Sequence, residues 1–145
     1  MKLQIKTNVQ ADLDAVKKGF DETLFKSLSP PFPRVELKRF DGSSKGDVVS
    51  LELNFIFFKQ LWTSEIVEES QDPNEWLFVD EGTQLPFFLR KWRHKHRVLK
   101  SDQGSVIVDD IEYAVGNLFF DCLLFPSLAL QFLYRRPIYQ RVFKK

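Results

Sequence analysis

The sequence FFLRKWRHKHRVLKSDQGSVIVDDIEYAV, at residues 87–115, predicts two long β-strands joined by a tight turn. Both arms alternate with a period of two, and turn-forming residues occupy positions 101–104 between them. Successive strand side chains point to opposite sides, so Trp92, His94 and His96 share one face. The other face of the same arm carries cations: Arg93, Lys95 and Arg97. Because these cations need water, we expect the face with Trp92 and the histidines to point inward.

The turn also predicts which residues of the two arms lie opposite each other. If Ser101 pairs with Gly104, opposite Cβ atoms in the antiparallel ladder are on the order of 5 Å apart. The predicted opposite pairs are His96 with Asp109, His94 with Ile111, and Trp92 with Tyr113. We therefore expect one shared inner face that carries Trp92, Tyr113, His94, His96 and Asp109.

Length, charge and cysteine content limit the class of protein. The 145 residues suit one domain, residues 1–145, and 21 Lys and Arg against 20 Asp and Glu leave a net charge of +1. Such a balance gives no field to attract nucleic acid or an anionic membrane. The single cysteine, Cys122, excludes an intramolecular disulfide and fits a reducing compartment. No segment approaches about 18 uninterrupted apolar residues, so we expect a cytoplasmic protein with no membrane span. From the charge balance we expect no nucleic-acid partner.

Aromatic residues are unusually frequent, with 15 Phe, 3 Trp and 3 Tyr. Side chains of this kind bury large areas and dominate protein cores. They can also line a cavity that accepts an apolar ligand. Composition alone favours the aromatic-rich core.

The first half of the chain predicts a strand, a helical segment and more strands. Residues 2–9 alternate as a half-buried strand, and residues 11–25 predict one or two short helices with Asp12 as a cap. Further strands are predicted in two hairpins, at residues 35–40 and 48–58, then 60–68 and 75–81. Within these strands, one face carries Trp62, Ser64 and Ile66, and another carries Trp76, Phe78 and Asp80.

After residue 116 the alternation ends and the pattern becomes helical. We predict a C-terminal helix over about residues 126–142, with Pro126 in its first turn and a bend or end at Pro137. The whole chain is then an α+β protein with a seven-stranded antiparallel sheet. Its apolar face must be covered, and the C-terminal helix is the large apolar element left to cover it.

Five short segments, in this order, carry a resemblance to a known superfamily: Phe78-Val79-Asp80-Glu81, Pro86-Phe87, Trp92-Arg93-His94-Lys95-His96, Asp109-Asp110-Ile111-Glu112-Tyr113 and Phe132-Leu133-Tyr134-Arg135. The chain resembles the START/Bet v 1-like (SRPBCC) superfamily, and more narrowly its bacterial ligand-binding members related to polyketide cyclases. The resemblance implies a helix-grip fold, a curved sheet around a long C-terminal helix. The chain departs from the subgroup pattern at Leu85, where the pattern has glycine, and in the link at residues 115–120.

The resemblance leaves three functions open. The first is a module that binds a hydrophobic small molecule, such as a lipid, a polyketide-like compound or an isoprenoid. The second is an enzyme of cyclase, dehydratase or hydrolase type in which His96 and Asp109 transfer protons. The third is an interaction protein whose cavity is filled by its own side chains. We favour the first, with these ligand-binding residues: Trp62, Phe78, Trp92 and Tyr113 for the apolar body, and His94, His96 and Asp109 for a polar group.

The histidines also raise the question of a metal. His94 and His96 lie about 7 Å apart on one strand face, and with Asp109 they form a set of residue types that can hold an ion. Nothing else in the sequence supports a metal. We therefore expect no metal and no cofactor, and we interpret these groups as hydrogen-bonded polar residues inside the sheet.

Overall fold

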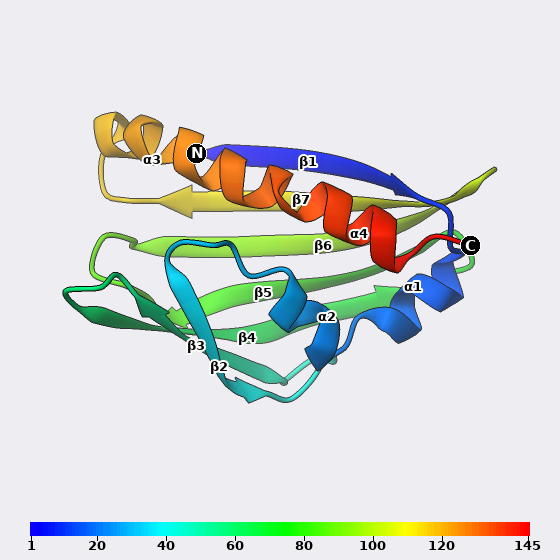
Figure 1. The fold of residues 1–145 in the computed structure, drawn as a ribbon, viewed down its shortest axis with the longest axis horizontal. Coiled ribbons are helices and arrows are strands. Elements are labelled where there is room, and N and C mark those ends of the chain that lie inside the picture. The colour runs from blue at the N-terminus through cyan, green and yellow to red at the C-terminus, as the bar shows by residue number, and fades with distance from the viewer.

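Seven strands form one antiparallel sheet in the computed structural model, which describes residues 1–145. The strand order is β1-β7-β6-β5-β4-β3-β2, so β1 and β2 are the edges. Figure 1 shows the helices on one face of this curved sheet, with α3 and α4 running along β7 and β1. The expected α+β helix-grip architecture is confirmed. The elements are β1 (Lys2–Val9), α1 (Leu13–Gly19), α2 (Glu22–Ser27), β2 (Arg34–Phe40), β3 (Val48–Asn54), β4 (Lys59–Gln71), β5 (Glu75–Gln84), β6 (Lys91–Ser101), β7 (Gly104–Ala114), α3 (Leu118–Leu133) and α4 (Arg135–Val142).

The hairpin of β6 and β7 has the predicted register. Ser101 pairs with Gly104, which has a positive φ of 141° that suits glycine in a tight turn. His96 lies opposite Asp109, and Trp92 lies opposite Tyr113. All five side chains expected on the inner face of this hairpin are buried. The period-two pattern therefore predicted both the pairing and the buried face correctly.

The two short helices after β1 are also confirmed. The Asp12 side chain accepts a hydrogen bond from the backbone of Ala15, and Asp21 accepts one from Leu24. Each carboxylate therefore caps the start of its helix, where backbone N–H groups lack partners.

The end of β3 differs from the expectation. The apolar alternation predicted a strand to residue 58, but β3 ends at Asn54 and β4 begins at Lys59. The Asn54 side chain accepts a hydrogen bond from the backbone of Ile56, which adopts a positive φ of 80°. This turn exposes 94% of Phe57. The hydrogen bond between the Asn54 side chain and the nearby backbone therefore ends β3, although the apolar pattern predicts a longer strand.

The C-terminal helical region begins earlier than predicted. α3 starts at Leu118, where Asn117 caps the helix by accepting a hydrogen bond from the backbone of Phe120. Pro126 therefore lies inside α3, and its predicted place in a first turn is wrong. The predicted break near Pro137 is confirmed, since α3 ends at Leu133. Pro137 has no N–H to donate to the carbonyl four residues earlier, which belongs to Leu133.

Two apolar clusters hold the helices on the sheet. In the first, Phe20 stacks on Tyr139 and Phe143 and contacts the edge of Trp76. This cluster fixes α1, α2 and α4 over one part of the sheet. The second cluster packs α3 on the strands at the other end through contacts that include Trp92 with Phe132. The sheet and helices thus share a core that is divided along its length.

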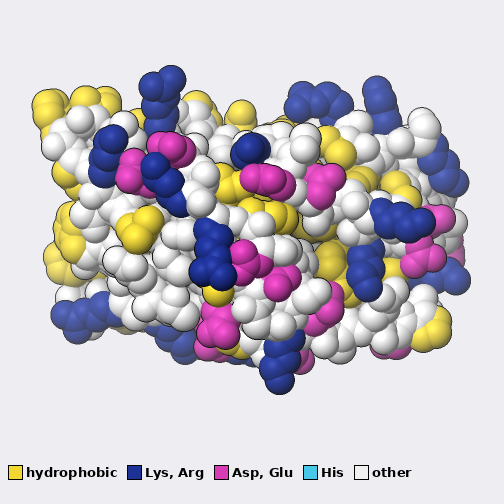
Figure 2. Space-filling model, turned by 90° about the horizontal axis from the view of Figure 1, so that it is seen from below, with side chains coloured by type: hydrophobic (Ala, Val, Ile, Leu, Met, Phe, Trp, Pro, Cys, Tyr) yellow, Lys and Arg dark blue, Asp and Glu magenta, His cyan; other side chains and the backbone are white.

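Part of the apolar surface is not covered. The helical segment Leu118–Val142 is long and apolar enough to cross a membrane by length and composition, a test that core helices of soluble proteins also pass. Figure 2 shows apolar side chains gathered at the left end of the molecule, the end where α3 begins in Figure 1. The large exposed apolar residues of α3 and of the turns after β3 and β5 include Leu118, Phe119, Leu123, Ile56, Phe57 and Phe87.

Candidate functional site

A cavity of about 290 Å³ lies between the sheet and the helices. Of the 33 residues that line it, 20 are hydrophobic. The lining residues come mainly from β2 to β6 on one side of the cavity and from α2, α3 and α4 on the other. Small-molecule sites in proteins are concave, mainly apolar, and carry a few convergent polar groups. The interior of this fold has that character.

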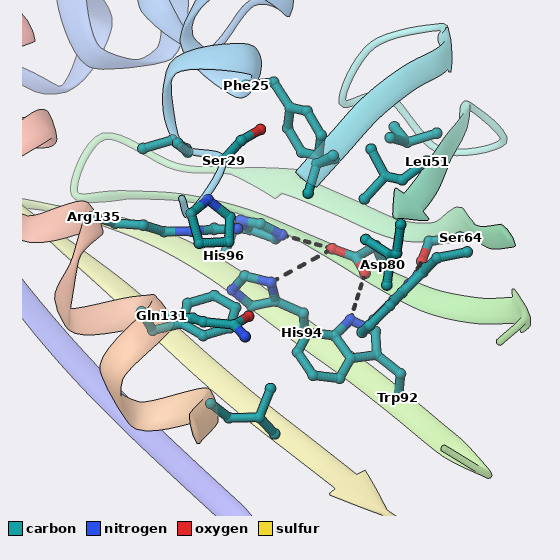
Figure 3. Close-up of a pocket in the computed structure, with 18 of the residues that line it drawn as sticks. Phe25, Ser29, Leu51, Ser64, Asp80, Trp92, His94, His96, Gln131 and Arg135 are labelled. Carbon is teal, nitrogen blue, oxygen red and sulfur yellow. Dashed lines mark hydrogen bonds and ion pairs between the residues drawn. The ribbon is translucent and has the colours of Figure 1, made fainter. Parts of the chain in front are cut away.

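The polar groups in the cavity wall and directly behind it lie on adjacent strands. Asp80 comes from β5, His94 and His96 from β6, and Asp109 from β7. Figure 3 shows His94, His96 and Trp92 converging on Asp80, with Gln131 and Arg135 reaching in from the helical side. These carboxylates and imidazoles are far from bulk water, so each needs a partner inside the protein.

Each histidine is hydrogen-bonded to one carboxylate. His94 Nε2 lies 2.8 Å from Asp109 Oδ1, and His96 Nε2 lies 2.6 Å from Asp80 Oδ2. The two imidazole rings stack with centroids 3.5 Å apart, and Phe78 stacks on His96 at 4.2 Å. The cluster is thus a continuous layer of rings with a carboxylate at each side.

His96 lies opposite Asp109 as predicted, but the hydrogen-bonded pair of His96 and Asp109 that the enzyme alternative requires is not formed. Asp80 lies opposite His94 on one neighbouring strand, and Asp109 lies opposite His96 on the other. Each histidine nevertheless bonds to the carboxylate that lies opposite the other histidine. Diagonal neighbours across a sheet are within reach of long side chains, so a correct backbone register did not determine the side-chain partner.

The hydrogen bonds and charges of the cluster determine its protonation. Burial acts to raise the pKa of Asp80, but the hydrogen bond and charge of His96, with help from His94 and Trp92, outweigh it and lower the pKa. Burial likewise acts to raise the pKa of Asp109, but the hydrogen bond and charge of His94 outweigh it and lower the pKa. Burial, and then the charge of His94, lower the pKa of His96 to about 4 against the pull of Asp80. At neutral pH both carboxylates are therefore ionised and His96 is neutral.

Trp92 connects this polar cluster to the apolar wall. Its indole Nε1–H donates to Asp80 Oδ1 at 3.1 Å, and its ring meets the edge of Trp62 with centroids 4.8 Å apart. The Trp62 indole donates to Ser64 at 3.1 Å. Both tryptophans thus present ring surface to the cavity while their N–H groups are satisfied.

The structure brings most of the sequence-predicted ligand residues to the cavity. The lining includes Trp62, Phe78, Trp92, His94 and His96. Asp109 and Tyr113 are buried behind the wall and do not line the cavity. The Tyr113 hydroxyl instead donates to the backbone carbonyl of Asp121 at 2.5 Å, and so connects β7 to the first turn of α3.

Sequence reasoning placed Asp80 on a face with Phe78 but did not include it in the site. A prediction of the register between β5 and β6 would have placed Asp80 in the site, because Asp80 lies opposite His94. Arg135 and Tyr139 also line the cavity. No local pattern could have placed these two residues there, since their position depends on how α4 packs on the sheet.

Comparisons of the sequence with families and curated proteins show no family for this chain. No protein-family model matches the chain. Serpin A11 of Rattus norvegicus is 32% identical over 68 residues, which are 47% of this chain, and the match spans 16% of the serpin's length. Because that match covers less than half of the chain, it shows no family.

Solved structures match nearly the whole chain at low sequence identity. Protein Ms6760 from Mycobacterium smegmatis has a TM-score of 0.65 at 16% identity, over 92% of this chain and 84% of its own. The ZhuI aromatase/cyclase from Streptomyces sp. R1128 has a TM-score of 0.65 at 15% identity, over 94% and 89%. A point mutant of norcoclaurine synthase from Thalictrum flavum has a TM-score of 0.62 at 16% identity, over 96% and 93%. The chain has the helix-grip fold of the START/Bet v 1-like (SRPBCC) superfamily.

Proposed function

We propose that this protein binds a small hydrophobic molecule, such as a lipid, a polyketide-like compound or an isoprenoid, between the sheet and the C-terminal helices. The observation that carries the proposal is an apolar cavity with Asp80, His94 and His96 clustered at one place in the wall. An apolar ligand that enters such a site gains about 25 cal/mol per Å² of apolar surface removed from water. The polar cluster then fixes which end of the ligand lies near β5 and β6.

The volume of the cavity limits the size of the ligand. About 290 Å³ is at the lower end of the range of about 300–1,000 Å³ found for small-molecule sites. A compact molecule, or one segment of a longer chain, therefore suits the site better than a whole phospholipid. The polar group that suits the cluster is a hydroxyl or another hydrogen-bond donor, because both carboxylates are ionised at neutral pH.

A cavity-blocking variant tests this proposal. Leu51 lines the cavity from β3, and Leu61 lies on β4 outside the lining. Leu51→Trp should reduce the affinity for an apolar fluorophore such as anilinonaphthalene sulfonate at least tenfold, whereas Leu61→Trp should leave it unchanged. A fatty acid, an isoprenoid alcohol and a naphthol would then compete for the site and identify the ligand class. Equal affinity in both variants would show that the fluorophore binds elsewhere and would contradict the proposal.

A second candidate is an enzyme of cyclase, dehydratase or hydrolase type that uses His96 for proton transfer, now with Asp80 in place of Asp109. It is favoured by the 2.6 Å hydrogen bond between His96 and Asp80 on the cavity wall. The names of two solved structures of this fold, an aromatase/cyclase and a synthase, describe enzymes. A pKa of about 4, however, makes His96 a weak base at neutral pH, where general bases work best with a pKa near 7. Binding is therefore the better-supported function.

Variants of the pair separate the two functions. If the protein is an enzyme, Asp80→Asn and His96→Gln should each reduce turnover of a bound compound by at least a hundredfold while its affinity changes little. If it is a binding protein, both variants should alter affinity and no turnover should be found with the wild type.

A further inference from the structure

We propose that Asp80, His94 and His96 bind a divalent transition-metal ion of the Zn²⁺ type at the polar end of the cavity. One donor atom from each of the three residues lies within 4.8 Å of the other two. Asp80 Oδ2 is 2.6 Å from His96 Nε2 and 3.8 Å from His94 Nδ1. Three potential donor atoms from two neighbouring strands therefore converge on one point. An ion at this point would replace the hydrogen bond between Asp80 and His96, and the ring proton of His96 would move to Nδ1, which has no partner in the structure.

The triangle formed by the donor atoms of Asp80, His94 and His96 has a size that fits a metal ion. Two of the distances between the donor atoms are 2.6 and 3.8 Å and the third is at most 4.8 Å, so all three atoms can lie within roughly 2.4 Å of a shared point. Zn²⁺ bonds to imidazole and carboxylate are about 2.0–2.2 Å long. Tetrahedral donors at these bond lengths lie about 3.3 Å apart, so His96 Nε2 would move about 0.7 Å away from Asp80 Oδ2 and His94 Nδ1 about 0.5 Å towards it. Two imidazoles and one carboxylate form a donor set that zinc and other first-row divalent ions accept.

The residue behind the triangle supports His94 as a ligand. His94 Nε2 is hydrogen-bonded to Asp109 Oδ1 at 2.8 Å, which leaves Nδ1 as the ring nitrogen that faces Asp80. Histidines that bind metals usually donate their other N–H to a carboxylate or carbonyl, which fixes the tautomer and the ring orientation. Asp109 is 1% exposed and its position is fixed by β7, so it orients His94 rigidly.

The ion would lie on the wall of the cavity and not in a closed site. Asp80, His94 and His96 all line the cavity, so three protein ligands leave at least one coordination position open on the cavity side. A ligand with an oxygen donor, such as a hydroxyl or carboxylate, can take that position. The same ion would balance the negative charges of the Asp80 and Asp109 carboxylates. The guanidinium of Arg135 also acts on Asp109.

This inference revises the expectation of no metal. The sequence analysis weighed Asp109 as the third ligand, but the structure gives that place to Asp80 and makes Asp109 the partner of His94. Metal binding can be measured without any organic ligand, so failure of this inference and failure of the proposed binding function are separate results.

The test is a titration of the metal-free protein with Zn²⁺ by calorimetry and with Co²⁺ by visible absorption. The chain has two histidines, both in this cluster, so a protein without a histidine tag gives a clean measurement. Cys122 is an exposed thiol and should be changed to serine in every sample, because thiolates also bind these ions. The variants are Asp80→Asn and His96→Gln, with Asp110→Asn as the matched control on the outer face of β7.

The expected result is one equivalent of metal in the parent protein, with affinity reduced at least a hundredfold by Asp80→Asn and by His96→Gln and unchanged by Asp110→Asn. Nitrogen-15 spectra of the parent protein provide a readout that needs no folded variant, since Zn²⁺ should shift the ring signals of both histidines. Absence of binding at millimolar Zn²⁺, or equal affinity in Asp80→Asn and Asp110→Asn, would overturn the inference.

Discussion

The two imidazole–carboxylate pairs on β6 differ in what surrounds them. In the pair of His94 and Asp109, both side chains are almost completely buried, at 4% and 1% exposure, and Asp109 does not line the cavity. In the pair of His96 and Asp80, the exposures are 9% and 15%, both residues line the cavity, and Trp92 also donates to the carboxylate. The first pair is closed on its carboxylate side, because Asp109 lies behind the cavity wall, whereas both members of the second pair face the space where a ligand would bind.

This difference indicates a division of roles within one polar cluster. Asp109 lies behind the cavity wall, and its hydrogen bond to His94 is the side-chain bond that satisfies its Oδ1, so this carboxylate depends strongly on its histidine. The open pair has a second hydrogen-bond donor and access to the cavity, so it can exchange partners at lower cost. We infer that Asp109 holds His94, and with it the cluster, in place, and that in the pair of His96 and Asp80 both members can contact what the cavity contains.

Removal of each histidine tests this division most strongly. His94→Ala leaves the Asp109 carboxylate without its hydrogen-bond partner in a closed site, and should reduce the free energy of unfolding by about 3–5 kcal/mol. His96→Ala creates a similar void but leaves Asp80 with Trp92, so the loss should be about 1–2 kcal/mol. Urea denaturation at pH 7 measures both, and Lys95→Ala, on the opposite face of the same strand, should change the free energy by less than about 0.5 kcal/mol. An equal loss in the two histidine variants would remove the distinction between the pairs.

Acid should weaken the metal-free protein through His96. The unfolded chain binds a proton at the ordinary histidine pKa near 6.5, whereas the folded protein holds the pKa of His96 at about 4. Stability from this group is complete above pH 6.5 and declines as the pH falls to about 4, by about 3 kcal/mol in total. Below that range the lowered pKa values of the two aspartates continue the loss in the same direction. The charged or titratable groups around His96 are His94, Asp80, Asp109, Arg135 and Tyr139.

Urea denaturation across pH 4–7 in EDTA measures this effect. His96→Gln keeps a hydrogen-bond donor for Asp80 but does not titrate, so its stability should change much less over the same range. A wild-type curve as flat as that of His96→Gln would show that His96 is not held neutral by its surroundings.

Strand pairing and the polar hairpin could be predicted from the sequence because they follow from local alternation and turn residues. Ser101 and Gly104 determined the register of β6 against β7, and the register placed Asp109 on the face of the histidines. The choice of hydrogen-bond partner was not predictable in this way, because it depends on Asp80 from a strand that the hairpin does not contain. The early start of α3 was missed because Pro126 was interpreted as a residue of the first turn, whereas the helix begins after the Asn117 cap and contains Pro126.

The two tryptophans of the cavity give a smaller test of the open pair. Trp92→Phe removes the N–H donated to the Asp80 carboxylate, and should cost about 1–2 kcal/mol of stability, because hydrogen bonds to charged groups are stronger than neutral ones. Trp62→Phe removes a bond to the neutral hydroxyl of Ser64 and should cost about 0.5–1 kcal/mol. Thermal and urea unfolding of the two variants compare them directly. A larger loss for Trp62→Phe would mean that Asp80 does not depend on the indole.

The smallest expected effect concerns the free oxygen of the closed pair. Asp109 Oδ2 and the Tyr139 hydroxyl are both buried and have no hydrogen-bond partner, and burial together with the charge of Asp109 raises the pKa of Tyr139. Tyr139→Phe removes one unsatisfied buried group, so the free energy of unfolding should stay the same or rise by up to about 1 kcal/mol. Tyr113→Phe is the matched control, because it removes a hydroxyl that donates to Asp121 and should lose about 1 kcal/mol. A loss above about 1.5 kcal/mol in Tyr139→Phe would mean that the hydroxyl forms a hydrogen bond in solution. A bond to one of the buried strand groups without a partner, which are Asp109 Oδ2, His96 Nδ1 and Thr7 Oγ1, would then hold α4 on the sheet.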